Sequence, residues 1–400
     1  MTTVTPEPQV TGDRTFPALN ALRAAGAIMV LSTHVAFDTG RILEGWTGAV
    51  LARFDFGVAL FFVLSGFLLS RPIFLARALG RPQPSTAHYF WKRALRIVPL
   101  YWVVVLAAMT LEPANRNVPW STWVEQFTLT QLYSPGLLPV GLTQMWSLAT
   151  EVAFYVLLPL LALALLWRPR PAGLAVTDVL LRLAVVAALG VAWQTNVAQI
   201  PGYQGHYAQW LPGYLPWFCA GMAFAVVSAS LRADPRPHVL ERVGADTAGC
   251  WILATAVFAL ACTPLAGPRT LAQPSGWDAF FKCVLYAIAA GLYVLPFVFG
   301  PERTGAIRNA ASARVPVFLG EVSFGIFCVH VLVLKAVFRR LDLDVFAGRF
   351  ETVWLGTAGM ALVLATVSFY WLERPALRLK NKGPFARARK ERQSAPTTST

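Results

Sequence analysis

Apolar runs of about 20 residues recur along this 400-residue chain and constrain its fold more than any other feature. A helix needs about 17 to 25 apolar residues to cross the hydrocarbon layer of a membrane. Because the backbone must satisfy its own hydrogen bonds in lipid, such runs predict transmembrane helices. The runs that fit lie at 17–37, 54–70, 98–111, 146–167, 178–195, 212–231, 247–266, 280–299, 317–338 and 352–372. We therefore predict an all-α integral membrane protein with about ten spans.

The composition agrees with this prediction and limits what else the chain holds. Hydrophobic residues make up 56% of it and charged residues 14%, which does not fit a single soluble domain with a polar exterior. Residues 1–15 lack a basic region and a cleavage site, so the first run is predicted to be a retained span. The five cysteines follow no metal or disulfide spacing. We expect one membrane domain at 16–376, a cytoplasmic segment at 1–15, a tail at 377–400, and no metal.

The basic residues indicate the orientation. The formal net charge is +14, and most of the 34 Lys and Arg residues fall in alternate loops and in the tail. The positive-inside rule then places both termini in the cytoplasm. Nucleic-acid binding is disfavoured because the charges are spread over many loops instead of one aromatic-rich face. The tail at 377–400 is basic and then Ser/Thr-rich, which predicts a disordered contact with anionic membrane lipid.

Two polar residues, Arg23 and His34, interrupt the first apolar run. Eleven residues are about three helical turns, so on a helix both side chains share a face and lie about 16 Å apart along the axis. Facing lipid would cost either residue several kcal/mol, so we expect both side chains to line a functional or water-filled site inside the protein. The alternative is that each reaches a membrane interface, with the arginine stem lying along apolar surface.

A second candidate pair, Arg93 and Arg96, lies in the basic segment before the third run. At a spacing of three residues on a helix, the two guanidinium groups point the same way. Their planar forks suit phosphate oxygens, which predicts a cytoplasmic site for an anionic ligand. The alternative is that they only mark the cytoplasmic end of a helix.

Glu151 lies five residues into a run that begins on the outer side, among apolar neighbours. A carboxylate there must be neutralised or find a partner. The predicted topology places it at the depth of His34, where it would orient a histidine base. Ser147 and Tyr155, four residues before and after, would complete a hydrogen-bonded strip.

Three further polar positions have alternative interpretations. Asp55 opens the second run and is either a partner of His34 or Arg53 or a helix cap. His330 in the ninth run is either a core histidine satisfied by neighbouring hydroxyl groups or a supporting member of the site. Glu373 and Arg374 are adjacent at a helix end, which predicts a local ion pair that closes the bundle.

Six blocks in order carry a family resemblance: Arg23-x10-His34, FFVLSGFLLSRP (61–72), Arg93-x2-Arg96 with IVPLY, WSLATEVAFY (146–155), GEVSFGIFCVH (320–330) and SFYWLERP (368–375). Together the blocks resemble the membrane-bound acyltransferase-3 family. The resemblance implies transfer of acetyl or other short acyl groups from acyl-CoA to hydroxyls of glycans, lipid-linked sugars or antibiotics such as macrolides. It also implies that His34 is the essential histidine and that Arg23, Arg93 and Arg96 handle acyl-CoA, with acetyl-CoA the expected donor.

The chain departs from that family in three places. Ala59 stands where many members have an acidic residue, and Phe327 stands where a tyrosine is usual. No esterase-like domain follows Pro375, so the resemblance is to the stand-alone members.

We therefore interpret the chain as a multi-pass O-acyltransferase of the cell membrane. The acceptor is a hydroxyl of a carbohydrate or a secondary metabolite, and direct transfer and an acyl-His34 intermediate both stay open. The alternative is a transporter or flippase in which Arg23, His34, Glu151 and His330 form a relay. The sequence shows no inverted repeat, and its arginines gather on the cytoplasmic approach, which favours the enzyme.

Overall fold

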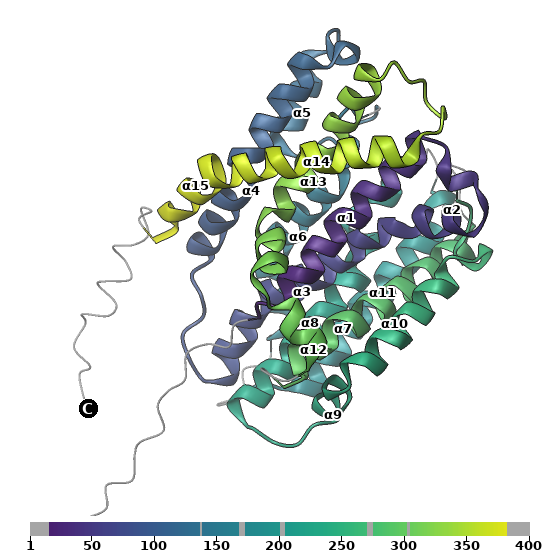
Figure 1. The fold of residues 1–400 in the computed structure, drawn as a ribbon. Helices are drawn as coiled ribbons and strands as arrows, with labels where there is room; N and C mark the ends of the chain where they lie inside the picture. Colours follow the sequence, from purple (N-terminus) through teal and green to yellow (C-terminus); the bar gives the residue numbers. More distant parts are fainter. Residues whose placement is uncertain are drawn as a thin grey trace, which may run out of the picture.

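The computed structural model describes residues 16–136, 138–167, 173–200, 205–269, 275–301 and 305–381, and within these ranges it contains helices and no strands. The predicted segment 1–15 and residues 382–400 of the predicted tail lie outside them. The helices are α1 (Leu19–Asp38), α2 (Gly45–Ala52), α3 (Phe56–Ala78), α4 (Thr86–Leu111), α5 (Trp120–Thr128), α6 (Met145–Leu165), α7 (Val176–Asn196), α8 (Leu215–Ala233), α9 (Val239–Ala245), α10 (Thr247–Ala261), α11 (Gly276–Phe299), α12 (Ala306–Ala311), α13 (Arg314–Arg340), α14 (Phe350–Ser368) and α15 (Arg374–Arg378) (Figure 1).

Within the described ranges, nine helical segments are long and apolar enough to cross a membrane. The pair α9 and α10 passes the same test together but is bent by 88°, so the number is ten if this pair is one span. The prediction of an all-α membrane protein with about ten spans is confirmed.

Two predicted boundaries were wrong. The third run was placed at 98–111, but α4 begins at Thr86, where the Ser85 side chain accepts a hydrogen bond from the His88 backbone N–H. The polar segment before the run is therefore the first part of the same helix. The run at 247–266 forms α10, which ends at Ala261, and Thr263 starts a separate turn at Pro264–Ala266. In both cases hydropathy alone missed the capping residue.

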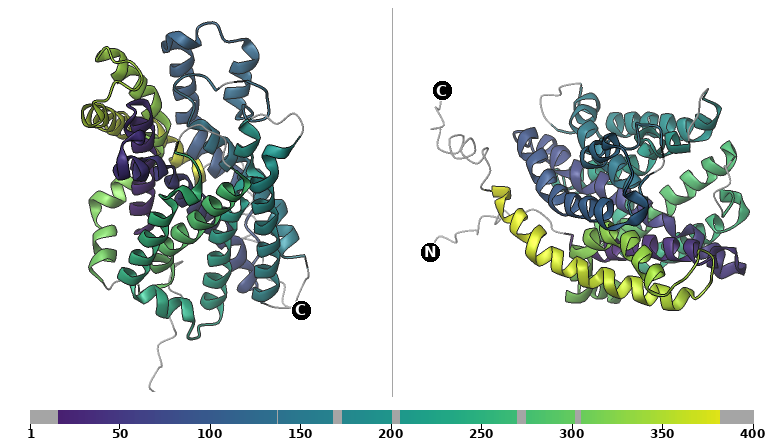
Figure 2. Two further views of the ribbon diagram at one scale, coloured as in Figure 1. Left: turned by 90° about the vertical axis from the view of Figure 1, so that its right-hand side faces the viewer. Right: turned by 90° about the horizontal axis from the view of Figure 1, so that it is seen from above.

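Helix α3 is the centre of the bundle. In the span that contains it, 72% of the most apolar stretch is buried, against 17% in the span of α7 and 28% in that of α14. Helix α3 packs on α8, α1 and α11. Helices α14 and α15 lie along the outer edge when the bundle is seen from above (Figure 2). Most side chains on α3 therefore face protein.

Glycines allow α3 and α8 to lie in direct backbone contact. A Cβ atom at Gly221 of α8 would lie 2.0 Å from the carbonyl oxygen of Val63, and one at Gly66 of α3 would lie 2.2 Å from that of Phe218. Such contacts between small residues are how membrane helices approach closely without a hydrophobic driving force.

We expect Gly221→Ala to destabilise the protein by about 1 to 3 kcal/mol, because the new methyl group must push α8 away from α3. Thermal unfolding of the purified protein in detergent measures this. Gly359→Ala in α14 is the matched control, since a Cβ there meets nothing within 4 Å. Equal unfolding temperatures for the two variants would show that the close contact between α3 and α8 does not contribute to stability.

The basic connections gather at one end of the bundle. Helices α9 and α12 lie at the lower end of Figure 1, and α2 and α5 lie towards its upper end. At the lower end Arg182 of α7 donates hydrogen bonds to the carbonyls of Ala164 and Leu165, the last residues of α6. The positive-inside rule predicts that this end faces the cytoplasm.

Candidate functional site

A cavity of about 420 Å³ lies within the bundle. Its walls come from α1, α3, α4, α6, α13 and the turns after α14. Five basic side chains line it, from Arg23, Lys92, Arg93, Arg96 and Lys380, together with the carboxylate of Glu151. This excess of cations makes the cavity a site for an anionic ligand.

Arg23 of α1 occupies the interior of this cavity. It makes no hydrogen bond with the described residues, and Arg96, Glu151 and Arg93 lie within electrostatic range of it. The Arg23 side chain is partly buried, and a guanidinium group with unused donors in a cavity inside a membrane domain favours a bound anion. The structure therefore places Arg23 with Arg93 and Arg96, in agreement with the grouping expected from the sequence.

Arg93 and Arg96 share one face of α4 and line the same cavity. The Nε atom of Arg93 is buried without a hydrogen-bond partner, and its guanidinium group lies over the Tyr155 ring at 5.9 Å. Arg96 donates to a carboxylate oxygen of Glu373 at 3.2 Å and to the backbone carbonyl of Glu321 at 3.4 Å. One arginine thus has a buried donor without a partner, and the other is held in place by an ion pair.

Glu373 differs from its prediction. It was expected to pair with Arg374 next to it, but it is 1% exposed and pairs with Arg96, while Arg374 lies over the Tyr370 ring. Residues Phe369–Glu373 form a π-helical segment between α14 and α15. The wider turn rotates the chain relative to a regular helix, and such segments recur at functional sites.

Glu151 was predicted to pair with His34, and this pairing is wrong. The Ser65 hydroxyl of α3 donates to Glu151, which lies in the cavity with Arg23. The prediction assumed that α6 begins at the membrane surface. Its first residue, Met145, is fully buried, as is Gln144 before it, so the helix starts inside the bundle.

The predicted strip around Glu151 is partly present. Ser147 and Tyr155 both line the cavity, and Tyr155 lies beside Glu151. The Ser147 hydroxyl instead donates to the backbone carbonyl of Gln144 at 3.2 Å. Ser65 was not predicted, although it lies in the FFVLSGFLLSRP block.

His34 of α1 lies beside His330 of α13. The Nδ1 atom of His34 is 2.8 Å from the Val30 carbonyl, and Nδ1 of His330 is 2.8 Å from that of Phe327. A carbonyl accepts only from an N–H group, so both Nδ1 atoms carry the proton in the neutral rings. The Nε2 atom of His330, 3.4 Å from Nδ1 of His34, is then an acceptor. Nε2 of His34 keeps a lone pair, as a base requires.

The surroundings of His330 differ from those expected for a core histidine held by hydroxyl groups. The residue is fully buried, and its partners are backbone carbonyls and His34. Ser323 bonds to the carbonyl of Gly320 instead. The structure thus places His330 beside His34, and its supporting role stays a prediction.

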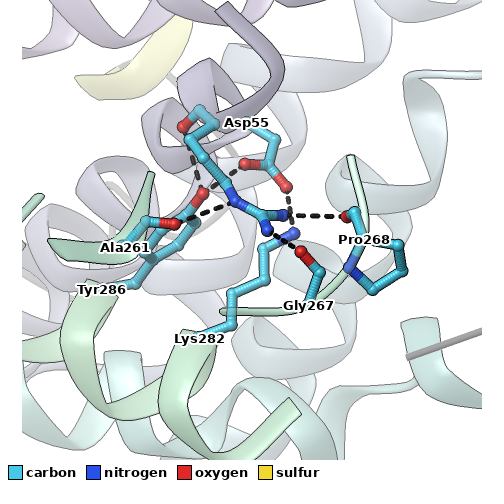
Figure 3. A network of polar contacts seen from close by, with 7 residues as sticks. Asp55, Ala261, Gly267, Pro268, Lys282 and Tyr286 are labelled. Carbon is cyan, nitrogen blue, oxygen red and sulfur yellow. Dashed lines mark hydrogen bonds and ion pairs between the residues drawn. The ribbon is translucent and has the colours of Figure 1, made fainter. Parts of the chain in front are cut away.

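Asp55 is neither a direct partner of His34 nor a side-chain cap of α3. Figure 3 shows its carboxylate between Lys282 Nζ at 2.5 Å and the Tyr286 hydroxyl at 2.6 Å. The guanidinium group in the same network belongs to Arg53 and donates to the carbonyls of Ala261, Gly267 and Pro268. This network ties the start of α3 to α11 and to the turn after α10.

Sequence reasoning missed an ion pair next to His34. Asp38 lies one turn further along α1 and pairs with Lys335 of α13 at 2.6 Å. Both residues, and Asp55, lie within electrostatic range of His34. The spacing of four residues between His34 and Asp38 was the available signal.

In the ranges that the structure describes, no group of three or more His, Cys, Asp or Glu residues could hold a metal ion.

Comparisons with known proteins agree with the sequence blocks. The profile of the family described as acyltransferase domain matches residues 16–372. The acyltransferase MdmB of Streptomyces mycarofaciens is 24% identical over 91% of this chain and 92% of its own length. The peptidoglycan O-acetyltransferase OatA of Listeria monocytogenes is 27% identical over 90% of this chain but only 55% of its own length. Nodulation protein 10 of Rhizobium leguminosarum is 26% identical over 81% of this chain and 82% of its own length. No solved structure matches the chain.

Proposed function

Because the chain belongs to the acyltransferase-3 family, we propose that it is an O-acyltransferase that uses acyl-CoA as the donor and a carbohydrate or secondary-metabolite hydroxyl as the acceptor. It is a multi-pass membrane protein and an enzyme that transfers groups other than aminoacyl groups. The catalytic domain is residues 16–376, and both termini face the cytoplasm. The observation that carries the choice of donor is the cationic cavity with its unused guanidinium donors.

The cavity suits the polyanionic end of acyl-CoA. The phosphates meet Arg93 and Arg96 on α4, and Arg23 holds the donor deeper in the bundle. Arg93 offers an unpaired donor, and Glu373 keeps Arg96 in a fixed orientation. Charge-assisted bonds from planar guanidinium groups are the strongest that side chains make to phosphate. Glu151 balances part of the charge of Arg23 when the cavity holds no donor.

His34 acts as the general base. Its Nε2 atom takes the proton of the acceptor hydroxyl while the hydroxyl oxygen attacks the thioester carbon. The C–S bond then breaks, and the CoA thiolate leaves and is protonated by the imidazolium of His34. His330 is a positioning residue: its ring packs edge to face on the ring of His34, while the Val30 carbonyl accepts from Nδ1–H of His34 and fixes the tautomer. A route through an acyl-His34 intermediate uses the same atoms in two steps.

The acceptor class follows from the relatives. Their names include a peptidoglycan O-acetyltransferase and an exopolysaccharide production protein, which favours a carbohydrate hydroxyl. The name of the acyltransferase MdmB states no acceptor, so a secondary metabolite such as a macrolide is kept as a second acceptor from the family resemblance alone. Lys335 and Asp38 near His34 offer polar contacts to either acceptor.

The test uses the purified protein in detergent with acetyl-CoA and a mixture of cell glycans or extracted small molecules. We expect mass spectrometry to show acetylated acceptor and free CoA in equal amounts, without an ion gradient. Transport of the acceptor that requires a gradient and leaves acetyl-CoA intact would favour the transporter alternative and contradict the proposal.

Arg93→Ala and Arg96→Ala test the donor site. One charged hydrogen bond is worth about 1.5 to 3 kcal/mol, so each change is expected to lower kcat/KM for acetyl-CoA roughly ten- to a hundredfold. A truncated acetyl thioester without the nucleotide should be used equally well by both variants and the wild type. An equal loss of kcat/KM with acetyl-CoA and with the truncated thioester would show that the arginines do not contact the nucleotide.

A further inference from the structure

The cationic cavity does not reach the histidine pair. Residues of α3 from Leu69 to Val58 line it, which is about 16 Å along the helix axis. At its deep end lie Phe61 and Phe327, but neither His34 nor His330 is among the residues that line it. If the proposed function is correct, the thioester must therefore pass a barrier between the cavity and the base.

The position of that barrier follows from contacts between helices. A Cβ atom at Gly57 of α3 would lie 3.0 Å from the carbonyl carbon of Gly26 and 2.9 Å from the Val30 side chain, which places Gly57 between these two levels of α1. Val58, next to Gly57, lines the cavity, and His34 is one turn beyond Val30 and two turns beyond Gly26, about 6 to 12 Å further along α1. On α13, Phe327 lines the cavity, and His330 follows three residues later. The cavity therefore ends about one to two helical turns before the base.

Two aromatic rings pack together near the closed end of the cavity. The Phe61 and Phe327 rings meet edge to face with centroids 6.2 Å apart, and the Phe327 ring lies 6.1 Å from the ring of His330. The Phe61 ring also packs on α1 at Gly26, where a Cβ atom would lie 3.5 Å from it. Phe327 of α13 is therefore the ring next to the histidines, and Phe61 of α3 supports it from the cavity side.

We propose that Phe61 and Phe327 form an aromatic gate that an acyl group must displace to reach His34, and that this gate restricts the enzyme to short acyl groups. The inference rests on the proposed function and adds its acyl-chain specificity. A short acyl group needs a small displacement of the rings. A longer chain needs space that the rings occupy, and in a close-packed interior that space is costly. The closed gate also separates the thioester from water that enters around the acceptor.

The test is the ratio of kcat/KM for hexanoyl-CoA to kcat/KM for acetyl-CoA. We expect Phe61→Ala to raise this ratio at least about tenfold, because a pocket discriminates by roughly that factor for each methylene group that it excludes. Phe61→Leu should raise it less and serves as a second variant if Phe61→Ala does not fold. Phe327→Tyr keeps the ring and should leave the ratio unchanged.

Phe62→Ala is the matched control. Phe62 is the neighbouring residue and also lines the cavity, but its ring stacks on Phe218 of α8 at 4.5 Å, away from the gate. Phe62→Ala removes the same side-chain volume as Phe61→Ala, and it should change kcat/KM for hexanoyl-CoA and for acetyl-CoA by the same factor. An unchanged ratio in folded Phe61→Ala and Phe61→Leu, with an active wild type, would overturn the gate and leave the proposed function intact. A wild type that transfers no acyl group from any acyl-CoA would instead contradict the proposed function.

Discussion

Replacing His34 with alanine is expected to lower the rate of acyl transfer about 10²- to 10⁴-fold, which is the contribution of a positioned general base. The change removes Nε2, the ring atom that has no backbone partner. It adds no polar group to α1, so expression and membrane insertion should be unchanged. Turnover of acetyl-CoA by the purified protein, with the unfolding temperature as a check on folding, measures the effect.

Two controls separate a missing base from a disturbed helix. His206→Ala alters a histidine in the turn Gly205–Gln209, far along the chain from either helix of the pair, and should leave the rate unchanged. His330→Ala keeps the base and the Val30 carbonyl that accepts from its Nδ1–H but removes the ring that packs beside it, so it should lower kcat more than KM and to a smaller extent than His34→Ala. Activity of His34→Ala within about threefold of the wild type would refute its role as the base.

Features that depend on one helix were predictable from the sequence. The spacing of Arg23 and His34 and that of Arg93 and Arg96 fix their relative direction wherever the helix lies. Hydropathy also located the spans, because a residue that faces lipid must itself be apolar, whatever its neighbours are. These rules need no knowledge of what packs against the helix.

Contacts between helices were not predictable in this way. His34 and His330 are 296 positions apart, and no pattern in either helix indicates that they meet. The depth of Glu151 depends on how far the chain before α6 enters the bundle, and hydropathy cannot report that because buried Gln144 is polar. The π-helical turn that contains Glu373 changes the face of its helix, so the expected neighbour Arg374 was the wrong partner.

The position of Glu151 also changes what its mutation should do. Because it lies beside Arg23 in the cavity, Glu151→Gln removes a balancing charge and leaves the base at His34 untouched. Arg23 and Glu151 are opposite charges that line one cavity, so removing either leaves the other without its balance and is expected to cost about 1 kcal/mol. We therefore expect both Glu151→Gln and Arg23→Gln to unfold at a lower temperature than the wild type.

The double variant Arg23→Gln with Glu151→Gln separates stability from donor binding. If Glu151 acts by balancing Arg23, the double variant leaves neither charge unpartnered and should recover most of the stability that each single variant loses. Its kcat/KM for acetyl-CoA should remain at least about a hundredfold below that of the wild type, because the deepest guanidinium group of the cavity is gone. Thermal unfolding and steady-state kinetics on the four proteins give both quantities. Stability losses that simply add would show that the two charges do not interact, and recovery of activity together with stability would show that Arg23 does not hold the donor.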